Sequence, residues 1–306
     1  MSLAIPLASI DAQTLVDALG LGAVYALMAV GIGLVFGVLR LVNFAYGQLV
    51  MAGAYTLAYT SDWPIVASIV ACFAVVIMLS SLMERLVFRP LRTQSPAVML
   101  VTTFALAFLL QNIALLIDLR DNTIGEAAAS IAPLNRAIVI GGVDVRKITI
   151  VTLIVAFCAL VALALLLGRT TIGLHMRAAA TDFRTARMLG VRADRVISTA
   201  VLLSALLAAT VAVILTVQFP LVAPDFALRD TIVVLVGVVV GGIDRLWTAT
   251  LGGFAIGFAS GIINGALPTE NTVYLPSVLF ALVIGVLLIR PAGLFARGGS
   301  SLVERV

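Results

Sequence analysis

The sequence predicts an all-α polytopic membrane protein with about nine transmembrane helices, within a range of about eight to ten. Its mean hydropathy of +1.19 exceeds what a soluble domain reaches, because a surface in contact with water must be largely polar. The apolar residues come in runs of about 20, the length that a helix needs to cross ~30 Å of hydrocarbon. These runs do not alternate between apolar and polar residues, so a transmembrane β-barrel is excluded.

Nine apolar segments carry this prediction, and together they make the chain 1–306 a single transmembrane domain. In order they are 15–38, 44–60, 64–83, 97–117, 148–168, 196–217, 231–243, 247–267 and 273–289. The seventh is short, rich in β-branched residues and ends in glycines, which is compatible with a broken helix covered by protein. Residues 40–50 are compatible with a continuous helix and with a re-entrant loop.

The basic residues predict the orientation of these segments. Of the 19 Lys and Arg residues, fourteen lie in the connections on one side of the membrane and five on the other. The 15 acidic residues divide in the opposite sense, five against ten. Because cytoplasmic connections carry the excess of Lys and Arg, the N-terminus is predicted outside and the C-terminus in the cytoplasm. The basic excess is therefore an orientation signal in a lipid bilayer, and no nucleic-acid partner is expected.

Two connections are long enough to have structure of their own. The first, 118–147, is predicted to be an extracytoplasmic loop, partly ordered, with room for a short amphipathic helix. The second, 169–195, is cytoplasmic, carries six arginines and contains good helix formers. In it, Asp182 can cap the start of a short helix, and Gly190 can supply the left-handed residue that ends it.

The chain lacks the residues that several kinds of chemistry require. Lys147 is the only lysine and follows Arg146, so a G-x-x-x-x-G-K-[ST] phosphate loop cannot exist. The single histidine, His175, excludes H-E-x-x-H zinc chemistry and is expected to be a solvated residue. The apolar segments hold almost no charge, so an ion-coupled carrier is poorly supported. We expect no catalytic residue, no metal site and no cofactor on this chain.

The polar residues within or beside the apolar segments are mainly amides. Amides in hydrocarbon must find partners, so they serve either as contacts between helices or as the lining of a solute pathway. A neutral lining suits a neutral or zwitterionic solute. The candidate pathway residues are Asn43, Tyr46, Gln48, Gln111, Asn112 and Asn264.

Glycines in the eighth segment predict close helix packing. Gly253, Gly257, Gly261 and Gly265 recur every four residues and share one helix face. Such a face permits the backbone of a neighbouring helix to approach closely.

Residues 20–55, GLGAVYALMAVGIGLVFGVLRLVNFAYGQLVMAGAY, closely resemble the N-terminal signature of the branched-chain amino acid permease family of ABC importers. In that signature a glycine-rich first span precedes an N-F-A-x-G-x-x-x-M-x-G-A-Y motif, here Asn43 to Tyr55. The R-P-L-R at 89–92, the segment at 177–195 and the L-L-I-R-P-A-G-L-F at 287–295 are similar to that family in the expected order. The resemblance therefore covers nearly the whole chain.

The resemblance implies an ABC importer permease fold in the bacterial cytoplasmic (inner) membrane. It implies a homologous second permease, two cytoplasmic ATPases that bind the ATP, and an extracytoplasmic solute-binding protein as partners. The implied activity is translocation of leucine, isoleucine or valine by alternating access. Urea, short amides and aromatic acids are the alternatives within the family, and a stand-alone facilitator or a non-transporting scaffold are the alternatives outside it.

The resemblance also explains the polar connection at 169–195. Permeases of this class carry a cytoplasmic helix–turn–helix that docks on the ATPase, often with an E-A-A-x-x-x-G pattern. Ala186 and Gly190 match that pattern, whereas Arg184 and Thr185 depart from its Glu-Ala, which removes a glutamate-based contact. The residues to which the resemblance assigns ATPase coupling are Asp182, Phe183, Arg184, Ala186, Arg187, Met188, Leu189 and Gly190.

Overall fold

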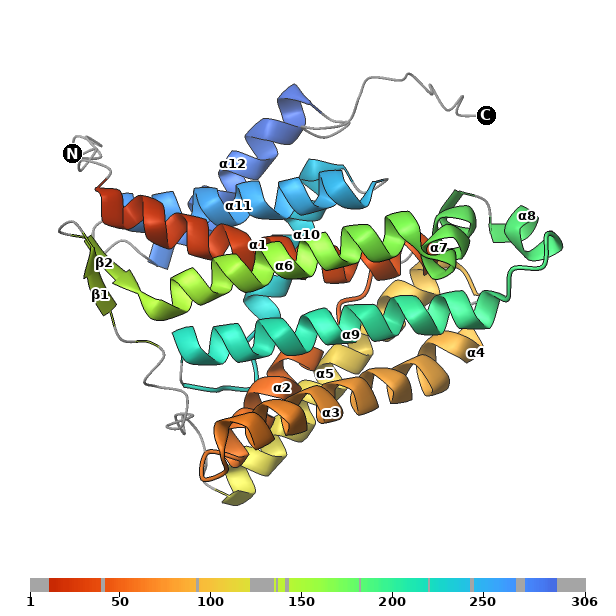
Figure 1. Cartoon of the computed structure of the whole chain (residues 1–306), viewed down its shortest axis with the longest axis horizontal. Coiled ribbons are helices and arrows are strands. Elements are labelled where there is room, and N and C mark those ends of the chain that lie inside the picture. Colours follow the sequence, from red (N-terminus) through yellow and green to blue (C-terminus); the bar gives the residue numbers. More distant parts are fainter. Residues whose placement is uncertain are drawn as a thin grey trace.

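The computed structural model describes residues 11–39, 42–91, 94–121, 135, 137–140, 143–181, 183–219, 221–242, 245–267 and 273–290. Its helices, labelled in Figure 1, are α1 (Ala12–Leu39), α2 (Tyr46–Tyr59), α3 (Ile65–Met83), the π-helix η1 (Glu84–Phe88), α4 (Arg89–Leu91), α5 (Pro96–Asp121), α6 (Lys147–Arg169), α7 (Thr171–Thr181), α8 (Phe183–Met188), α9 (Ala193–Gln218), α10 (Leu228–Gly241), α11 (Leu246–Ala266) and α12 (Leu275–Ile289). A hairpin of β1 (Ala137–Ile140) and β2 (Val143–Arg146) lies between α5 and α6 in the sequence.

The long helix α1 is the centre of the bundle. It packs against α6, α9, α10 and α11, and in Figure 1 α1, α6, α9 and α11 run along the long axis of the molecule. Nearly every residue from Ala18 to Val35 is buried. Apolarity alone does not explain this burial, because α6 is more apolar than α1 and yet is mostly unburied. The many Gly and Ala residues of α1 instead allow neighbouring helices to approach it closely.

The glycine face of α11 packs directly on α1, as the sequence predicts. A Cβ added to Gly257 would lie 2.8 Å from the carbonyl oxygen of Leu21 and 2.9 Å from Cα of Gly22. A Cβ on Gly253 would likewise lie 2.8 Å from the carbonyl oxygen of Tyr25. Only glycine allows the two backbones to approach this closely.

Each of the nine apolar segments forms a helix, and within the described residues six helices are long and apolar enough to cross a membrane. These six are Ala12–Leu39, Ile65–Leu91, Ala97–Ile117, Lys147–Arg169, Asp194–Gln218 and Leu246–Ala266. The helices α2 and α10 have 14 residues each and α12 has 15, so each spans ~21–23 Å of the ~30 Å required. The polytopic helical architecture is confirmed, whereas nine crossings and the orientation stay predictions.

Helix α2 begins inside the bundle rather than at its end. Asn43 and Ala45 are non-helical yet buried, so the chain turns back into the protein after α1. The ring of Tyr46 contacts Gly31, which lies eight residues, or ~12 Å, before the end of α1. A helix start at this depth is possible because protein covers its free backbone groups.

Helix α10 begins beside the start of α2. A Cβ on Gly47 would lie 2.9 Å from the carbonyl oxygen of Ala227, and it would also meet the hydroxyl of Thr231. Both Ala227 and Thr231 are fully buried. The seventh segment is therefore a short helix that starts within the bundle, and it is continuous from Leu228 to Gly241 rather than broken.

The connection at 118–147 contains a β-hairpin where a loop and a short amphipathic helix were expected. Ile138 pairs with Val145 in an antiparallel register. The β-branched residues on both sides of Gly141-Gly142 are typical of a hairpin with a two-residue turn. The all-α prediction thus misses one small sheet. Residues 122–134, where the amphipathic helix had room, lie outside the described residues.

Candidate functional site

Three of the six predicted pathway residues form one buried polar set at the start of α2, namely Asn43, Tyr46 and Gln48. Asn43 has a structural partner, because its Oδ1 accepts a 3.0 Å hydrogen bond from the backbone N–H of Ala45. A side chain that bonds two residues ahead stabilises a turn. Asn43 therefore shapes the turn that directs the chain into α2.

Tyr46 and Gln48 are buried without such partners. Tyr46 is 0% exposed and Gln48 is 1% exposed. Neither Tyr46 Oη nor Gln48 Oε1 has a hydrogen-bond partner among the described residues. An unpaired buried polar atom costs about 1–3 kcal/mol, and in native proteins it usually indicates a bound water, ion or ligand. Their hydrogen-bonding capacity is therefore not used within the described part of the chain.

Further polar groups surround this set but are already hydrogen-bonded. On α9, Ser204 Oγ donates to the carbonyl oxygen of Gly31 over 2.8 Å, beside Tyr46. On α10, Thr231 Oγ1 donates to the carbonyl oxygen of Ala227 over 2.7 Å, beside Gly47. Helices α1, α2, α9 and α10 therefore all contribute to the surroundings of the buried polar set.

Asp230 is a candidate residue that the sequence analysis missed. It lies in the first turn of α10, and its Oδ1 accepts a 2.9 Å hydrogen bond from Oη of Tyr25, a buried residue in the middle of α1. The predicted span began at 231, which left Asp230 in the outer connection. An ionisable residue among membrane helices is a functional candidate by default, and an acidic residue immediately before an apolar run was the available signal.

The other three predicted pathway residues are not part of the buried polar set. Asn112 and Asn264 are exposed, and Gln111 is half-buried. Asn112 Nδ2 donates to the carbonyl oxygen of Phe108 in its own helix over 2.7 Å. These amides therefore do not belong to the buried centre of the chain.

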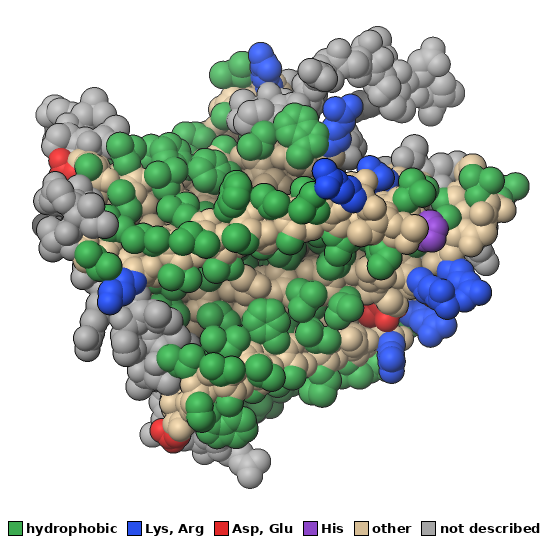
Figure 2. All heavy atoms as spheres, viewed as in Figure 1, with side chains coloured by type: hydrophobic (Ala, Val, Ile, Leu, Met, Phe, Trp, Pro, Cys, Tyr) green, Lys and Arg blue, Asp and Glu red, His purple; other side chains and the backbone are tan. Residues whose placement is uncertain are grey.

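The polar connection at 169–195 folds as α7, α8 and a turn, which agrees with the predicted helix–turn–helix. In Figure 2, the arginines and the histidine gather towards the end of the molecule that carries α7 and α8. We call residues 182–190 the coupling segment. Ala186 is buried, whereas Met188 and Leu189 are 81% and 80% exposed. Asp182 and the side chains of Phe183, Arg184 and Arg187 lie outside the described residues.

Gly190 ends α8 as the sequence predicts. Its φ of +89° lies in the left-handed region that favours glycine. The backbone N–H of Val191 donates to the carbonyl oxygen of Ala186 over 3.1 Å, which is the six-to-one hydrogen bond of a Schellman motif. This termination leaves Met188 and Leu189 at the exposed tip of the segment.

An α-helical bundle of this length and apolarity, with polar groups at its centre, is a multi-pass inner-membrane protein of the permease class. Residues 14–290 match the family described as branched-chain amino acid transport system / permease component, and the chain belongs to this family of ABC transporter permeases. The resemblance of residues 20–55 is thereby confirmed.

Curated relatives match along almost the whole chain. The high-affinity branched-chain amino acid transport system permease protein BraD of Pseudomonas aeruginosa is 29% identical over 299 residues, which are 93% of this chain and 95% of the relative. LivH of Escherichia coli K12, with the same description, is 29% identical over 304 residues and shows the same coverage. The probable branched-chain amino acid transport permease protein LivH of Methanocaldococcus jannaschii is 26% identical over 280 residues, 88% of this chain and 87% of the relative. No solved structure matches the chain.

Proposed function

We propose that this chain is the transmembrane permease subunit of an ABC importer that translocates branched-chain or related neutral amino acids by alternating access. The observation that carries the proposal is the family match over residues 14–290. The whole chain 1–306 acts as one permease domain. It pairs with a homologous permease and takes solute from an extracytoplasmic binding protein. Two cytoplasmic ATPases supply the energy, and the chain itself binds no ATP and catalyses no reaction.

The proposed solute pathway passes the start of α2. Gln48 Oε1 can accept a hydrogen bond from a solute, and Tyr46 Oη can donate or accept one. Neutral hydrogen-bonding groups suit an amino acid, which is zwitterionic and carries no net charge. Gln111, Asn112 and Asn264 contribute where the homologous permease covers the exposed faces of α5 and α11.

The proposed ATPase contact is the coupling segment. Met188 and Leu189 project from a turn that Gly190 holds, and exposed apolar side chains on a short rigid turn are suited to insertion into a groove. Closure of the ATPase dimer on ATP would displace this turn. The displacement would be passed to the spanning helices that follow it.

The test is to purify the protein from its native membrane in mild detergent and to identify stoichiometric companions by mass spectrometry. We expect a second permease and two ATPases with phosphate loops. The solute-binding protein then identifies the solute: labelled leucine displaced by isoleucine and valine supports the proposal, whereas displacement only by urea, an amide or an aromatic acid changes the substrate. A chain that purifies alone and moves solute without ATP is a facilitator, and the proposal is then wrong.

A further inference from the structure

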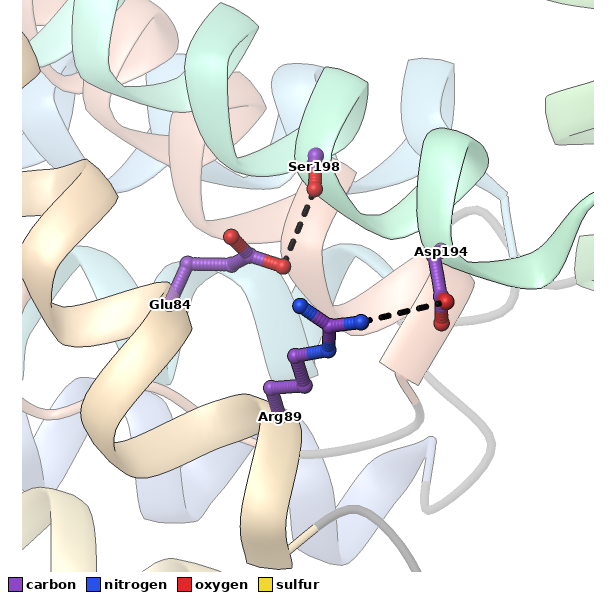
Figure 3. A network of polar contacts seen from close by, with 4 residues as sticks. All are labelled: Glu84, Arg89, Asp194 and Ser198. Atoms are coloured by element: carbon purple, nitrogen blue, oxygen red, sulfur yellow. Dashed lines mark hydrogen bonds and ion pairs between the residues drawn. The ribbon is translucent and has the colours of Figure 1, made fainter.

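Two polar contacts join η1 and α4, which continue α3, to the first turns of α9 (Figure 3). Ser198 Oγ donates a hydrogen bond to Glu84 Oε1 over 2.9 Å, and Arg89 Nη2 lies 3.6 Å from Asp194 Oδ2. Glu84 is only 9% exposed, whereas the side chains of Arg89 and Asp194 are 58% and 52% exposed. The two helices are therefore joined by one largely buried contact and one solvent-exposed contact.

The π-helix η1 explains why Glu84 and Arg89 lie on the same side. Pro90 has no N–H, and in an α-helix its ring would clash with the carbonyl of Leu86. The chain instead widens, and the backbone N–H of Arg89 donates to the carbonyl oxygen of Glu84, five residues earlier. In an α-helix, side chains five residues apart point ~140° apart, whereas one π turn brings them together. Both reach towards α9 in Figure 3.

The partner residues on α9 are positioned by ordinary α-helical spacing. Asp194 and Ser198 are four residues apart and so share one face. Asp194 is the second residue of α9 and lies four residues after Gly190, where the coupling segment ends. A displacement of the coupling segment therefore reaches the contact with Arg89 within the first turn of α9.

Helix α3 leads from these contacts back to the buried polar set. It packs against α2 at Gly53, where an added Cβ would lie 3.1 Å from Cys72 Sγ and 3.1 Å from Val76. Helix α2 carries Tyr46 and Gln48 at its buried end. Helix α9 also packs against both α2 and α3, so these three helices form one connected group.

We propose that Glu84, Arg89, Asp194 and Ser198 lock α3 to α9, so that both helices follow the coupling segment as one unit. This inference rests on the proposed function and adds the route by which the ATPase acts on α2. The four side chains are proposed as positioning residues, because the contacts that they make join one helix to another. When these contacts are removed, α9 shifts relative to α3, and less solute is transported for each ATP hydrolysed.

The first test reverses the exposed ion pair in the assembled complex of permeases, ATPases and binding protein in proteoliposomes. Arg89→Asp and Asp194→Arg each place like charges opposite one another. We expect each to lower the number of solutes transported per ATP about fivefold or more, and the double reversal to restore most of it. Arg85→Asp is the matched control, since it makes the same charge change in η1 at an exposed residue with no polar contact to the described part of α9.

The outcomes separate this inference from the proposed function. Single variants that keep the wild-type ratio of solute to ATP, or a double reversal that stays as low as the singles, overturn the lock. Solute transport and ATP hydrolysis are both measured per assembled complex, and the amount of complex is determined from the amount of each subunit. A variant that assembles poorly therefore does not change the ratio of solute to ATP. A wild-type complex that shows no ATP-driven uptake overturns the proposed function instead.

A second test replaces the buried contact with a reversible covalent one. Cys72 and Cys158 are changed to Ser, and Glu84→Cys and Ser198→Cys are then introduced together. Before cross-linking, the ratio of solute to ATP should be low because the hydrogen bond is gone. A short bifunctional thiol reagent should restore the ratio, and its reductive cleavage should lower it again. If cross-linking abolishes transport, the two helices must separate during the cycle, and the lock is wrong.

Discussion

The polar residues at the start of α2 have two different roles. Asn43 is satisfied by the backbone of Ala45, so it belongs to the folding of the turn. Tyr46 and Gln48 are equally buried, yet Tyr46 Oη and Gln48 Oε1 find no partner among the residues that the structure describes. Interior polar atoms are retained against a cost of about 1–3 kcal/mol each, which is expected where a solute pairs with them in passing.

Replacing Gln48 by leucine should separate stability from transport. Leucine has a similar size and removes an unpaired polar group, so the thermal midpoint in detergent should stay the same or rise. Uptake should fall about tenfold, which corresponds to the loss of ~1.4 kcal/mol of solute stabilisation.

Thr210→Val is the matched control for this substitution. The Thr210 hydroxyl is half-buried on α9 and bonds only within its own helix, to the carbonyl oxygen of Leu206 over 2.9 Å. We expect this variant to transport normally. If Gln48→Leu also transports at the wild-type rate, Gln48 is a packing residue and not part of the pathway.

The sequence indicates which residues are chemically unusual but not which of them lack partners. Amides stand out in an apolar chain, so Gln48 was identifiable from its type and place alone. Helix α2 packs against α3, α9 and α10, two of which are distant in the sequence, so the absence of a partner becomes visible only in the fold. Asp230 was missed for the same reason, since Tyr25 lies 205 residues away.

At the scale of single elements, glycine controls the contact between α1 and α11. Gly257→Ala should lower the free energy of unfolding by about 1–3 kcal/mol, because the new methyl group would overlap the α1 backbone at Leu21. Thermal unfolding followed by tryptophan fluorescence measures the change. Gly37→Ala is the matched control, because a Cβ there meets no atom within 4 Å and alanine favours the helix. Equal midpoints for both variants would contradict the close packing.

The turn at Gly190 is the second element that can be tested by itself. Gly190→Trp should abolish ATP-driven uptake, because a side chain other than glycine is strained at a φ of +89° and the turn should change shape. Insertion and expression should stay intact, because a Cβ at this position meets no atom within 4 Å. Gly190→Asn should retain much of the uptake, since asparagine tolerates the left-handed region. Wild-type uptake by the tryptophan variant would exclude docking at the coupling segment.

Most helices could be predicted because long apolar runs leave few alternatives in a bilayer. The starts of α2 and α10 lie within three residues of the predicted 44 and 231. Their depth inside the bundle could not be predicted, because only the burial of Asn43 and Ala227 shows it. The hairpin of β1 and β2 was missed because each strand has only four residues, and the whole connection was interpreted as a loop. Local composition shows which residues form helices, but it does not show how deeply each helix is buried among the others.

At the scale of the whole molecule, the described helices sort into two groups. Six are of membrane length, whereas the apolar helices α2, α10 and α12 have only 14 or 15 residues. The unequal distribution of arginines predicts which end of this bundle faces the cytoplasm. Since α7 and α8 lie at the same end as most of the basic side chains visible in Figure 2, the predicted cytoplasmic side and the coupling segment coincide.

Thiol labelling tests that direction. In a chain with Cys72→Ser and Cys158→Ser, a membrane-impermeant reagent should label Thr123→Cys in intact cells and should label Thr181→Cys only after lysis. The positive-inside distribution is the physical reason for both expectations. Labelling of Thr181→Cys from outside would reverse the orientation.

We expect this chain to move an amino acid only when ATPases drive it. The first experiment is uptake of labelled leucine by proteoliposomes that contain the purified permeases, with the ATPases, binding protein and ATP each omitted in turn. We expect uptake against a gradient in the complete system and none after any omission. Uptake by the permease alone, or uptake that continues without ATP, would contradict it.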